Sequence, residues 1–361
     1  MGRYVDNLVP ALVRAGVDVV VAVVERDAQV YDGTGARVRV VRGLGRRPVR
    51  MAWEQSGLPA LARRVRADVL HSPHYTRPAA LGVPVVVTLH DATFFSHPEL
   101  HTRLKRTFFR TATRFAVRTA DALVVPSAAT RDEILRFVGG RPERFHVAHH
   151  GVDADVFHPV GAEAAHAVAR DLGVDGSYVA FLGTLEPRKN VPALVRAWVE
   201  VARTRQEPPA LVLAGARGWD DQIEAACAVV PTDLRVVVPG YLPVASLAPL
   251  LAGADVVAYP SLGEGFGLPV LEAMAAGGCV LTTRELSLPE VGGDAVAYCG
   301  TSENSIAAAL RDLLDDAGRR AELRAAALER AALFTWDAAA QAHVVAFEAA
   351  AAGNGRRRSV G

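Results

Sequence analysis

The sequence predicts an α/β protein with two doubly wound domains, each a parallel sheet covered by helices. With 361 residues, the chain is longer than one hydrophobic core usually supports. Half of its residues are apolar and 22% are charged, which is ordinary for globular proteins and excludes a disordered chain. Short β-branched runs alternate with helical patterns. This alternation restarts after an irregular Gly- and Pro-containing stretch at residues 149–160, so two domains fit better than one barrel.

The first domain, residues 1–157, contains six predicted strands, several of them continuously apolar, as expected when helices cover both faces of a sheet. They are residues 17–25, 37–41, 68–72, 83–90, 121–127 and 144–149. The second domain, residues 158–334, contains another six, at residues 178–183, 210–215, 235–240, 254–261, 279–283 and 295–300. The stretch 149–160, with His149 and His150, is interpreted as the linker, and the tail 353–361 is predicted to be disordered.

Composition excludes several classes of protein. The three cysteines, Cys227, Cys279 and Cys299, form no CxxC pair and have no Cys/His ligand spacing, so neither a disulfide framework nor a structural zinc site is expected. The first residues lack a basic region followed by an apolar run, so we expect no signal peptide. No segment reaches the roughly 18 apolar residues that span a membrane. These features predict a reduced, cytoplasmic protein.

Charge is divided unevenly along the chain. Residues 1–157 carry 23 basic and 15 acidic side chains, whereas residues 158–361 carry 17 and 24, so a formal net charge of +1 conceals two halves of opposite sign. Such a split indicates halves with different partners. The near-zero total and the lack of aromatic–basic platform motifs disfavour nucleic acid as a partner.

A glycine loop at residues 263–267 follows the predicted strand 254–261 and precedes a helix that Pro269 can open at its first turn. Exposed N–H groups at such a helix start favour oxygen-rich or anionic ligands. The loop is not a dinucleotide fingerprint, because Leu268 stands where the last glycine of GxGxxG belongs, and no GKS or GKT forms a P-loop.

Charged residues accompany two of these strand ends. Glu264 and Glu272 bracket the glycine turn, and carboxylates there can accept hydrogen bonds from hydroxyl groups of a sugar or ribose. Taken singly, Glu272 could merely complement the helix N-terminus while Glu264 is solvated. Arg188 and Lys189, one of only two lysines, precede another helix near Asn190 and suit a diphosphate. In isolation such a pair is more often a solvated loop.

Together, EGFGLPVLE (264–272) and EPRKN (186–190) closely resemble the motifs of the family 4 retaining glycosyltransferases, which have the GT-B fold. The resemblance covers nearly the whole chain. It includes VTLHDATFFSHPE (87–99), VVPSAATRDEI (124–134) and AHHGVDADVFHP (148–159). FTWDAAAQAHVVAFE (334–348) resembles the family's final helix, so residues 335–352 are expected to return to the first domain. The resemblance implies two Rossmann-like domains that face an interdomain cleft, an acceptor domain followed by a donor domain.

The resemblance also implies roles for particular residues. Arg188 and Lys189 match the pair that holds the donor diphosphate and stabilises the departing nucleotide, and Glu264 matches the glutamate that faces the transferred sugar. The implied donor-binding residues are the amides of Gly265, Phe266, Gly267 and Leu268 at the sugar, Glu272 at the ribose, and Gly240 and Tyr241 near the nucleobase. The family needs no metal, and no DxD-type motif contradicts this, so a nucleotide-diphosphate sugar is the only co-substrate implied.

In the first half, His90 and Asp91 end the predicted strand 83–90, at the edge where open sheets contact ligands. His90 matches the family histidine that faces the transferring sugar, with a positioning role rather than that of a nucleophile. Any one of the 11 histidines, picked blindly, would more often be structural. Ser127, at the end of another strand, is a weaker candidate.

A basic helix is predicted at residues 101–121. Four arginines recur every fourth residue along one stripe, with phenylalanines between them: Arg106, Arg110, Arg114 and Arg118. One hypothesis is that this stripe meets acidic membrane lipid or a polyprenyl-diphosphate acceptor, which would make the protein peripheral on the inner face of the membrane. A solvated amphipathic helix with its phenylalanines in the core is an equal alternative.

The start of the sequence departs from the family pattern, which opens with a strand, a glycine loop and a helix. Here the chain begins inside the expected loop, at residues 1–4, so a central strand of the first sheet is expected to be missing. Gly2 is a weak candidate for a contact with the donor phosphates.

These observations predict a metal-independent, retaining glycosyltransferase that moves a hexose to a hydroxyl of a glycan, lipid-linked or small-molecule acceptor. GDP-mannose is the first expected donor, and UDP-sugars come next. The alternative is a non-catalytic or N-terminally truncated relative that binds sugar nucleotides. An epimerase of the same architecture is not expected to carry both motifs.

Overall fold

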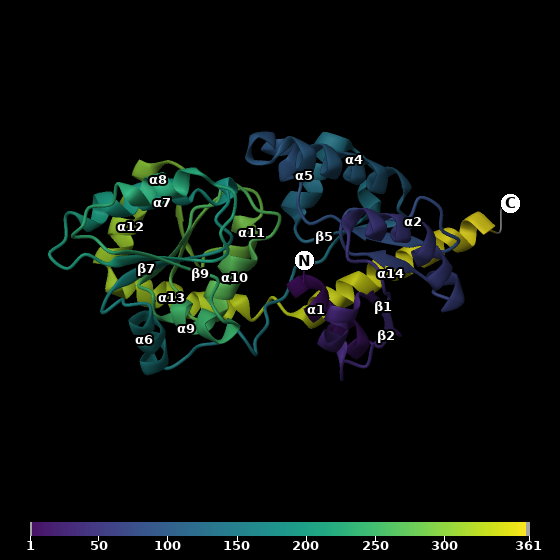
Figure 1. The fold of residues 1–361 in the computed structure, drawn as a ribbon, viewed down its shortest axis with the longest axis horizontal. Coiled ribbons are helices and arrows are strands. Elements are labelled where there is room, and N and C mark those ends of the chain that lie inside the picture. Colours follow the sequence, from purple (N-terminus) through teal and green to yellow (C-terminus); the bar gives the residue numbers. More distant parts are fainter. Residues whose placement is uncertain (1, 359–361) are drawn as a thin grey trace. The chain divides into compact units, whose positions relative to one another are not determined.

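The computed structural model describes residues 2–358 (Figure 1) and divides the chain into two units. The first unit comprises residues 1–151 and 335–361, and the second comprises residues 152–334. The first unit therefore ends before the predicted residue 157. The physical reason is that Phe157 is buried in the hydrophobic core of the second unit, and the backbone N–H of Val152 donates to the carbonyl of Phe334 there.

The second unit is built on one continuous parallel sheet. Its strand order is β12-β11-β10-β7-β8-β9. The strands are β7 (Tyr178–Leu182), β8 (Ala210–Ala214), β9 (Val236–Gly240), β10 (Val256–Tyr259), β11 (Val280–Thr283) and β12 (Ala297–Cys299). Every residue of β7 and β8 is buried, as expected for apolar strands that helices cover on both faces.

Helices of the second unit alternate with its strands, as the β-branched and helical runs predict. They are α6 (Ala162–Asp171), α7 (Val191–Ala202), α8 (Gln222–Ala228), α9 (Leu247–Gly253), α10 (Leu268–Ala275), α11 (Leu288–Gly292), α12 (Glu303–Asp315) and α13 (Ala317–Ala331). Trp198 of α7 is fully buried, and its indole N–H donates to the carbonyl of Pro209 at 2.9 Å, so this large side chain leaves no polar group unsatisfied.

The first unit contains two separate parallel sheets. One pairs β1 (Val20–Val23) with β2 (Arg37–Val40), and the other has the order β3-β4-β5-β6. The second sheet comprises β3 (Leu70–Ser72), β4 (Val85–Thr88), β5 (Ala122–Val125) and β6 (Phe145–Val147). The strands that the sequence predicts for this domain therefore form two sheets, which are not joined between β1 and β3.

Helices of the first unit are α1 (Gly2–Arg14), α2 (Arg47–Arg64), α3 (Thr93–Ser96), α4 (Arg103–Thr119), α5 (Ala128–Val138) and α14 (Trp336–Arg358). Figure 1 shows α1 beside α14, and α14 packs in turn against β4, β5 and β6. The last helix therefore belongs to the first unit, as the family pattern implies. It continues to Arg358, past the expected end at residue 352, because the alanine-rich segment before Gly353 favours helix. The remainder of the predicted disordered tail, residues 359–361, lies outside the described residues.

All twelve predicted strands contain an observed strand, each within the predicted limits. One local expectation is wrong. Gly2 was expected in a loop, but it is the first residue of α1. The helix starts this early because Tyr4, Leu8 and Leu12 recur at helical spacing and are all buried.

Candidate functional site

The second unit has a topological switch point between β7 and β10. From β7 the chain adds β8 and β9 on one side and then returns to place β10 on the other side of β7. In open parallel sheets, ligands bind beyond the carboxyl ends of the strands at such a point. The short helix Pro187–Lys189 follows β7, and the loop 260–267 follows β10, so both sequence motifs lie at this edge.

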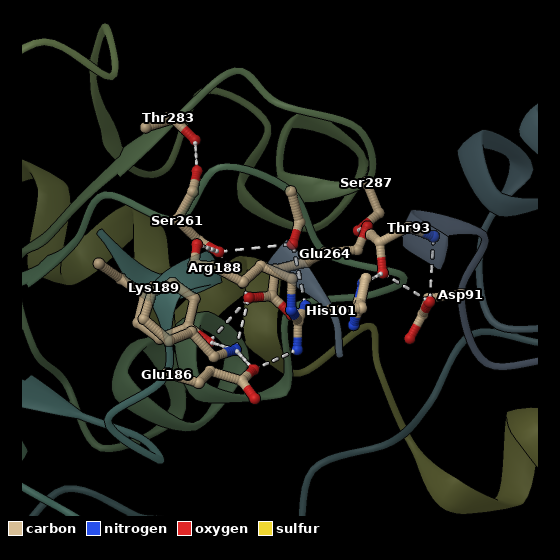
Figure 2. A network of polar contacts seen from close by, with 12 residues as sticks. Asp91, Thr93, His101, Glu186, Arg188, Lys189, Ser261, Glu264, Thr283 and Ser287 are labelled. Carbon is tan, nitrogen blue, oxygen red and sulfur yellow. Dashed lines mark hydrogen bonds and ion pairs between the residues drawn. The ribbon is translucent and has the colours of Figure 1, made fainter. Parts of the chain in front are cut away.

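Glu264 is the centre of a buried charge network at this edge (Figure 2). Its Oε2 accepts from Arg188 Nη1 at 2.5 Å and its Oε1 from Lys189 Nζ at 2.6 Å. Arg188 also donates to Glu186 Oε1 at 2.8 Å through Nη2 and to the carbonyl of Gly263 at 2.9 Å through Nη1. Two cations and two carboxylates thus gather in one place. The structure brings together three of the residues that the sequence indicates: Arg188, Lys189 and Glu264.

The charges of this network fix its protonation. Burial alone would raise the pKa of Glu264, but the positive charges of Arg188 and Lys189 outweigh burial and lower that pKa to about 2. Burial and the neighbouring Arg188 charge lower the pKa of Lys189, while Glu264 and Glu186 oppose that shift. Because only 6% of Lys189 and 6% of Glu264 is exposed, the pair is held in a poorly solvated place where charge interactions are strong.

Two hydroxyl groups that the sequence analysis missed complete the network. Tyr259 donates to Glu264 Oε1 at 3.0 Å and accepts from Lys189 Nζ, and Ser261 donates to the same carboxylate oxygen at 2.7 Å. Both are fully buried or nearly so. Their signal in the sequence was their position, since they end the apolar run ADVVAYPS, immediately before the glycine loop.

Side chains of β11 and of the residue that precedes α11 donate hydrogen bonds to the backbone of the loop 260–267. Thr283 of β11 donates to the carbonyl of Ser261 at 2.7 Å, and Ser287 donates to the carbonyl of Glu264 at 2.8 Å (Figure 2). These bonds fix where Glu264 points, because they anchor its own backbone and that of a residue three positions earlier. A preorganised polar site needs this kind of support.

The glycine loop ends in a left-handed residue that opens α10. Gly267 has φ +104°, and a Cβ there would stand 2.9 Å from Leu288 Cδ2, so this position favours glycine on both counts. Pro269 lies in the first turn of α10, as predicted. Phe266 and Glu272 are buried, at 4% and 3% exposure. Glu264 is buried as well, so the alternative in which Glu264 is solvated is wrong.

Gly240 and Tyr241 lie at the carboxyl end of β9, two strands away from β7. Gly240 has φ +76°, and Tyr241 is 75% exposed. An exposed aromatic ring at this sheet edge is free to cover a flat ligand. The structure therefore keeps these residues at the ligand-binding edge and outside the charge network around Glu264.

His90 lies in the first unit, just beyond the end of β4. Its Nε2 is 2.8 Å from the carbonyl of Pro73, and since a carbonyl only accepts, Nε2 must carry the proton. The Tyr4 ring stands edge-on to the His90 ring at a centroid distance of 4.8 Å. Burial, with a smaller contribution from His74, lowers the pKa of His90 to about 4, so this imidazole is neutral at pH 7.

Other candidates of the first unit have local structural roles. The Asp91 carboxylate accepts from the N–H and the hydroxyl of Thr93 at the start of α3, and Ser127 caps α5 by accepting from the N–H of Thr130 at 3.0 Å. Such capping is the usual work of Asp and Ser at a helix start. Gly2 begins α1 and is exposed. His150, expected in the linker, is 5% exposed and stacks on Trp336.

The arginines of α4 do not form a uniform solvent-facing stripe. Arg110 Nε donates to the carbonyl of Phe94 at 2.7 Å, and Arg110 and Arg114 both lie over the Phe95 ring. Phe109 packs in the core, as the solvated-helix alternative expects, but Phe108 and Phe115 are each 37% exposed. Within residues 2–358, no helix is long and apolar enough to cross a membrane.

The chain is similar in sequence to known glycosyltransferases. The family described as Glycosyltransferase Family 4 matches residues 1–156, and the family described as Glycosyl transferases group 1 matches residues 168–330. The O-antigen chain mannosyltransferase B of Escherichia coli is 30% identical, covering 80% of this chain and 74% of its own. A D-inositol 3-phosphate glycosyltransferase of Kineococcus radiotolerans is 32% identical, covering 95% and 88%.

Solved structures agree on the fold. The Anabaena protein HepE, crystallised in complex with UDP-glucose, has a TM-score of 0.73 at 19% identity over 92% of both chains. The two units are thus the two Rossmann-like domains of a GT-B glycosyltransferase, and the chain belongs to glycosyltransferase family 4.

Proposed function

We propose that this glycosyltransferase moves a hexose from a nucleotide-diphosphate sugar to an acceptor hydroxyl and retains the anomeric configuration. The observation that carries the proposal is the convergence of Arg188 and Lys189 on Glu264, buried at the switch point between β7 and β10. In this proposal the two cations would face the leaving group of a nucleotide sugar, where negative charge develops, and stabilising such charge is a large source of catalysis.

Glu264 and Glu186 form ion pairs with Arg188, and Glu264 also pairs with Lys189. A bound diphosphate would take over the two cations, and the Glu264 carboxylate would then accept hydrogen bonds from hydroxyl groups of the sugar. Tyr259 and Ser261 would hold the carboxylate in place during this exchange. The low pKa of Glu264 in this network supports an ionised carboxylate at neutral pH, which accepts hydrogen bonds and is not suited to donate a proton.

The remaining donor contacts follow the loops at the same sheet edge. The amides of residues 265–268 would bind sugar hydroxyls, Glu272 would bind the ribose, and Gly240 with Tyr241 would border the nucleobase. His90 of the first unit would orient the transferring sugar in its neutral form. The acceptor would attack on the face from which the nucleotide leaves, and the departing diphosphate oxygen would take the proton of the acceptor hydroxyl.

We propose that transfer needs no metal ion, because Arg188 and Lys189 supply the positive charge at the diphosphate. We propose GDP-mannose as the first donor to test and UDP-sugars as the next. The name of the Escherichia coli relative, a mannosyltransferase, supports mannose as the transferred sugar, whereas the Anabaena structure with UDP-glucose supports a UDP-sugar. The proposed acceptor is a hydroxyl of a glycan, lipid-linked or small-molecule acceptor, which the names of the two relatives, an O-antigen chain mannosyltransferase and a D-inositol 3-phosphate glycosyltransferase, support.

We also propose that α4 meets an anionic membrane surface. Leu104 is 82% exposed, and it shares one side of the helix with Phe108 and Phe115, beside Arg118. Exposed apolar side chains flanked by arginine are typical of helices that lie in a membrane interface. Flotation with anionic and neutral vesicles tests this: preferential binding to anionic vesicles supports it, and equal or absent binding contradicts it.

The enzymatic proposal is tested by incubating the purified chain with GDP-mannose, UDP-glucose and a panel of hydroxyl acceptors, with and without EDTA. We expect transfer that EDTA does not reduce, and a product whose anomeric configuration, read by NMR, equals that of the donor. The interrupted sheet of the first unit favours a second candidate, a binder without activity. Binding of a sugar nucleotide without transfer or hydrolysis would support that candidate and contradict ours.

A further inference from the structure

Two carboxylates pair with the cations of the proposed donor site, and the structure holds them in different ways (Figure 2). Glu264 accepts hydrogen bonds from Arg188 and Lys189 and also from two neighbouring hydroxyl groups, which hold it independently of the cations. Glu186 has no such support. Within the part of the chain that the structure describes, only Arg188 and Lys189 form a hydrogen bond or an ion pair with its carboxylate.

Glu186 lies directly after β7, and its backbone is fixed there. Its N–H donates to the carbonyl of Thr184 at 2.9 Å, and its own carbonyl accepts from the N–H of Lys189 at 2.9 Å. Its Oε1 lies 2.8 Å from Arg188 Nη2 and 3.9 Å from Lys189 Nζ. The carboxylate and the two cations therefore belong to one turn of the chain, which keeps them beside one another.

The place that Glu186 occupies is poorly solvated. Its side chain is 12% exposed, and those of Arg188 and Lys189 are 16% and 8% exposed. Charges in such a place interact several-fold more strongly than charges in water. Burial is the largest influence on the pKa of Lys189 and lowers it, and the charge of Glu186 opposes this shift. Glu186 is thus a fixed counter-charge that acts on both cations.

A nucleotide sugar and the nucleoside diphosphate that it leaves behind differ in charge. The bond to the sugar blocks one oxygen of the terminal phosphate, and in the product this oxygen is free to ionise. The product therefore carries more negative charge near pH 7 than the nucleotide sugar does. A negative charge fixed beside the cations repels both ligands, and it repels the product more strongly. Such a charge discriminates between two ligands that share the same nucleotide.

We propose that Glu186 is a specificity-determining residue, which makes the site favour the nucleotide-sugar donor over the nucleoside diphosphate product. The inference rests on the proposed function, because it needs a diphosphate that binds Arg188 and Lys189. Glu264 would then be occupied by hydroxyl groups of the transferred sugar, whereas Glu186 remains beside the diphosphate. Glu186 would weaken binding of the product and so favour its release after transfer.

Glu186→Gln removes the charge and keeps an oxygen that can accept from Arg188 Nη2. The matched control is Glu200→Gln, which removes the same charge from an exposed ion pair with Arg311. Calorimetric titration measures the Kd of each ligand, with UDP-glucose and UDP as one pair and GDP-mannose and GDP as the other. For the pair that binds, Glu186→Gln should lower the Kd of the product at least roughly tenfold and that of the nucleotide sugar by about threefold or less. Glu200→Gln should change neither value.

Glu186→Asp is the conservative variant, because it keeps the charge on a shorter side chain. The ratio of the two Kd values should stay within about threefold of the ratio in the unsubstituted protein. If Glu186 only positioned Arg188, both substitutions would instead raise both Kd values. Inhibition of transfer by added product gives an independent readout, since the inhibition constant should fall in Glu186→Gln alone.

Weaker or unchanged binding of the product to Glu186→Gln would overturn the proposal, as would an equal change in the Kd of both ligands. Amide exchange of β7 and β8 verifies that the second unit is folded. If Glu186→Gln does not fold, a Kd ratio in Glu186→Asp that departs more than roughly tenfold from that of the unsubstituted protein overturns the proposal, and an unchanged ratio supports it. These results leave the proposed function standing when the unsubstituted protein binds the nucleotide and Lys189→Met does not. Failure of the unsubstituted protein to bind any of the four ligands would contradict the proposed function, and this inference with it.

Discussion

The two sheets of this protein differ at their centres. In the second unit β7 is fully buried between β8 and β10, and the charged residues of the proposed donor site follow it directly. In the first unit the centre is a groove, and β1 beside it has no fully buried residue. The same alternation of strands and helices thus gives one continuous sheet, which carries the proposed donor site, and one interrupted sheet.

The polar groups at the two sheet edges differ accordingly. After β7 and β10 the network is charged, whereas at the ends of β3 and β4 it is neutral. His343 Nδ1 donates to the carbonyl of Ala339, so its Nε2 accepts from Tyr4, whose oxygen then accepts from Thr88. Thr88 accepts in turn from His71 Nε2. Helices α1 and α14 thus supply two members of a hydrogen-bond chain at the edge of an interrupted sheet.

The largest expected effect follows from removing the central charge of the second unit. Glu264→Gln keeps the shape of the side chain but leaves Arg188 and Lys189 with Glu186 alone. Breaking a buried ion pair in this way costs about 3–5 kcal/mol of unfolding free energy. Loss of a preorganised group at the reacting sugar should lower the transfer rate at least roughly 100-fold. Urea unfolding and a transfer assay measure both effects.

The matched control is Glu303→Gln, which removes the exposed partner of Arg196 in the same unit. An exposed ion pair contributes little to stability, so the unfolding free energy should change by less than about 0.5 kcal/mol. The transfer rate should stay the same. Equal effects of the two substitutions would show that burial and position at the switch point do not distinguish Glu264.

As the pH falls, the two units should lose stability in different pH ranges. The pKa of Glu264 is lowered from 4.5 to about 2, so its stabilising contribution is complete above pH 4.5 and is lost as the pH falls toward 2. Burial lowers the pKa of His90 and of His343 from 6.5 to about 4, so their contribution is complete above pH 6.5 and is lost between pH 6.5 and 4. The first unit should therefore weaken first, by an amount on the order of 3 kcal/mol for each of these histidines.

Amide exchange recorded at pH 7, 5.5 and 4.5 resolves the two units within one sample. Protection of β4 and β5 should fall at pH 5.5, while that of β7 and β8 should persist. Simultaneous loss in both units would contradict the neutral character assigned to the histidines of the first unit.

A smaller effect is expected at the glycine loop. Gly267→Ala combines φ +104° with a Cβ 2.9 Å from Leu288, and we expect a loss of about 2 kcal/mol of unfolding free energy together with a higher KM for the donor. Gly277→Ala is the comparison, because Gly277 also has positive φ, +81°, but the nearest atom would be 3.9 Å away. About 1 kcal/mol and an unchanged KM are expected there. A KM equally raised in both would contradict a role of the loop in donor binding.

The smallest effect concerns the neutral hydrogen-bond series in the first unit, in which Tyr4 lies between His343 and Thr88. Tyr4→Phe removes the hydroxyl between Thr88 and His343 while keeping the ring against His90. We expect a loss of about 1–2 kcal/mol from the first unit, measured by chemical denaturation, because His343 Nε2 then lacks its donor. No change at all would mean that the hydroxyl is not part of a directed chain.

Much of the fold could be predicted from the sequence. The twelve strands follow from apolar β-branched runs that recur with helical segments, a local signal that burial between helix layers reinforces. The unit boundary was harder to predict, because Phe157 sits in an irregular stretch and only tertiary packing assigns it to the second unit. The start of α1 was missed because Gly2 has low helix propensity, and packing of Tyr4 overrides it.

For the site, Arg188, Lys189 and Glu264 could be predicted from motifs that follow strands. Their mutual neutralisation could not, since Glu264 is 75 residues from Lys189 in sequence and the contact depends on β7 lying beside β10. Tyr259 and Ser261 were missed for a related reason. They lie at the end of an apolar strand, where the sequence does not distinguish them from ordinary core residues, and only the fold brings their hydroxyl groups to Glu264.

The central claim is that the buried cations after β7 hold the diphosphate of a sugar nucleotide. Calorimetric titration of GDP and UDP into the protein, into Lys189→Met and into Lys105→Met tests it directly, since Lys105 is the only other lysine and lies exposed on α4. We expect at least one of the two nucleotides to bind the unsubstituted protein and Lys105→Met equally. In Lys189→Met the Kd of that nucleotide should rise at least roughly 100-fold. An unchanged Kd in a folded Lys189→Met protein would contradict the account.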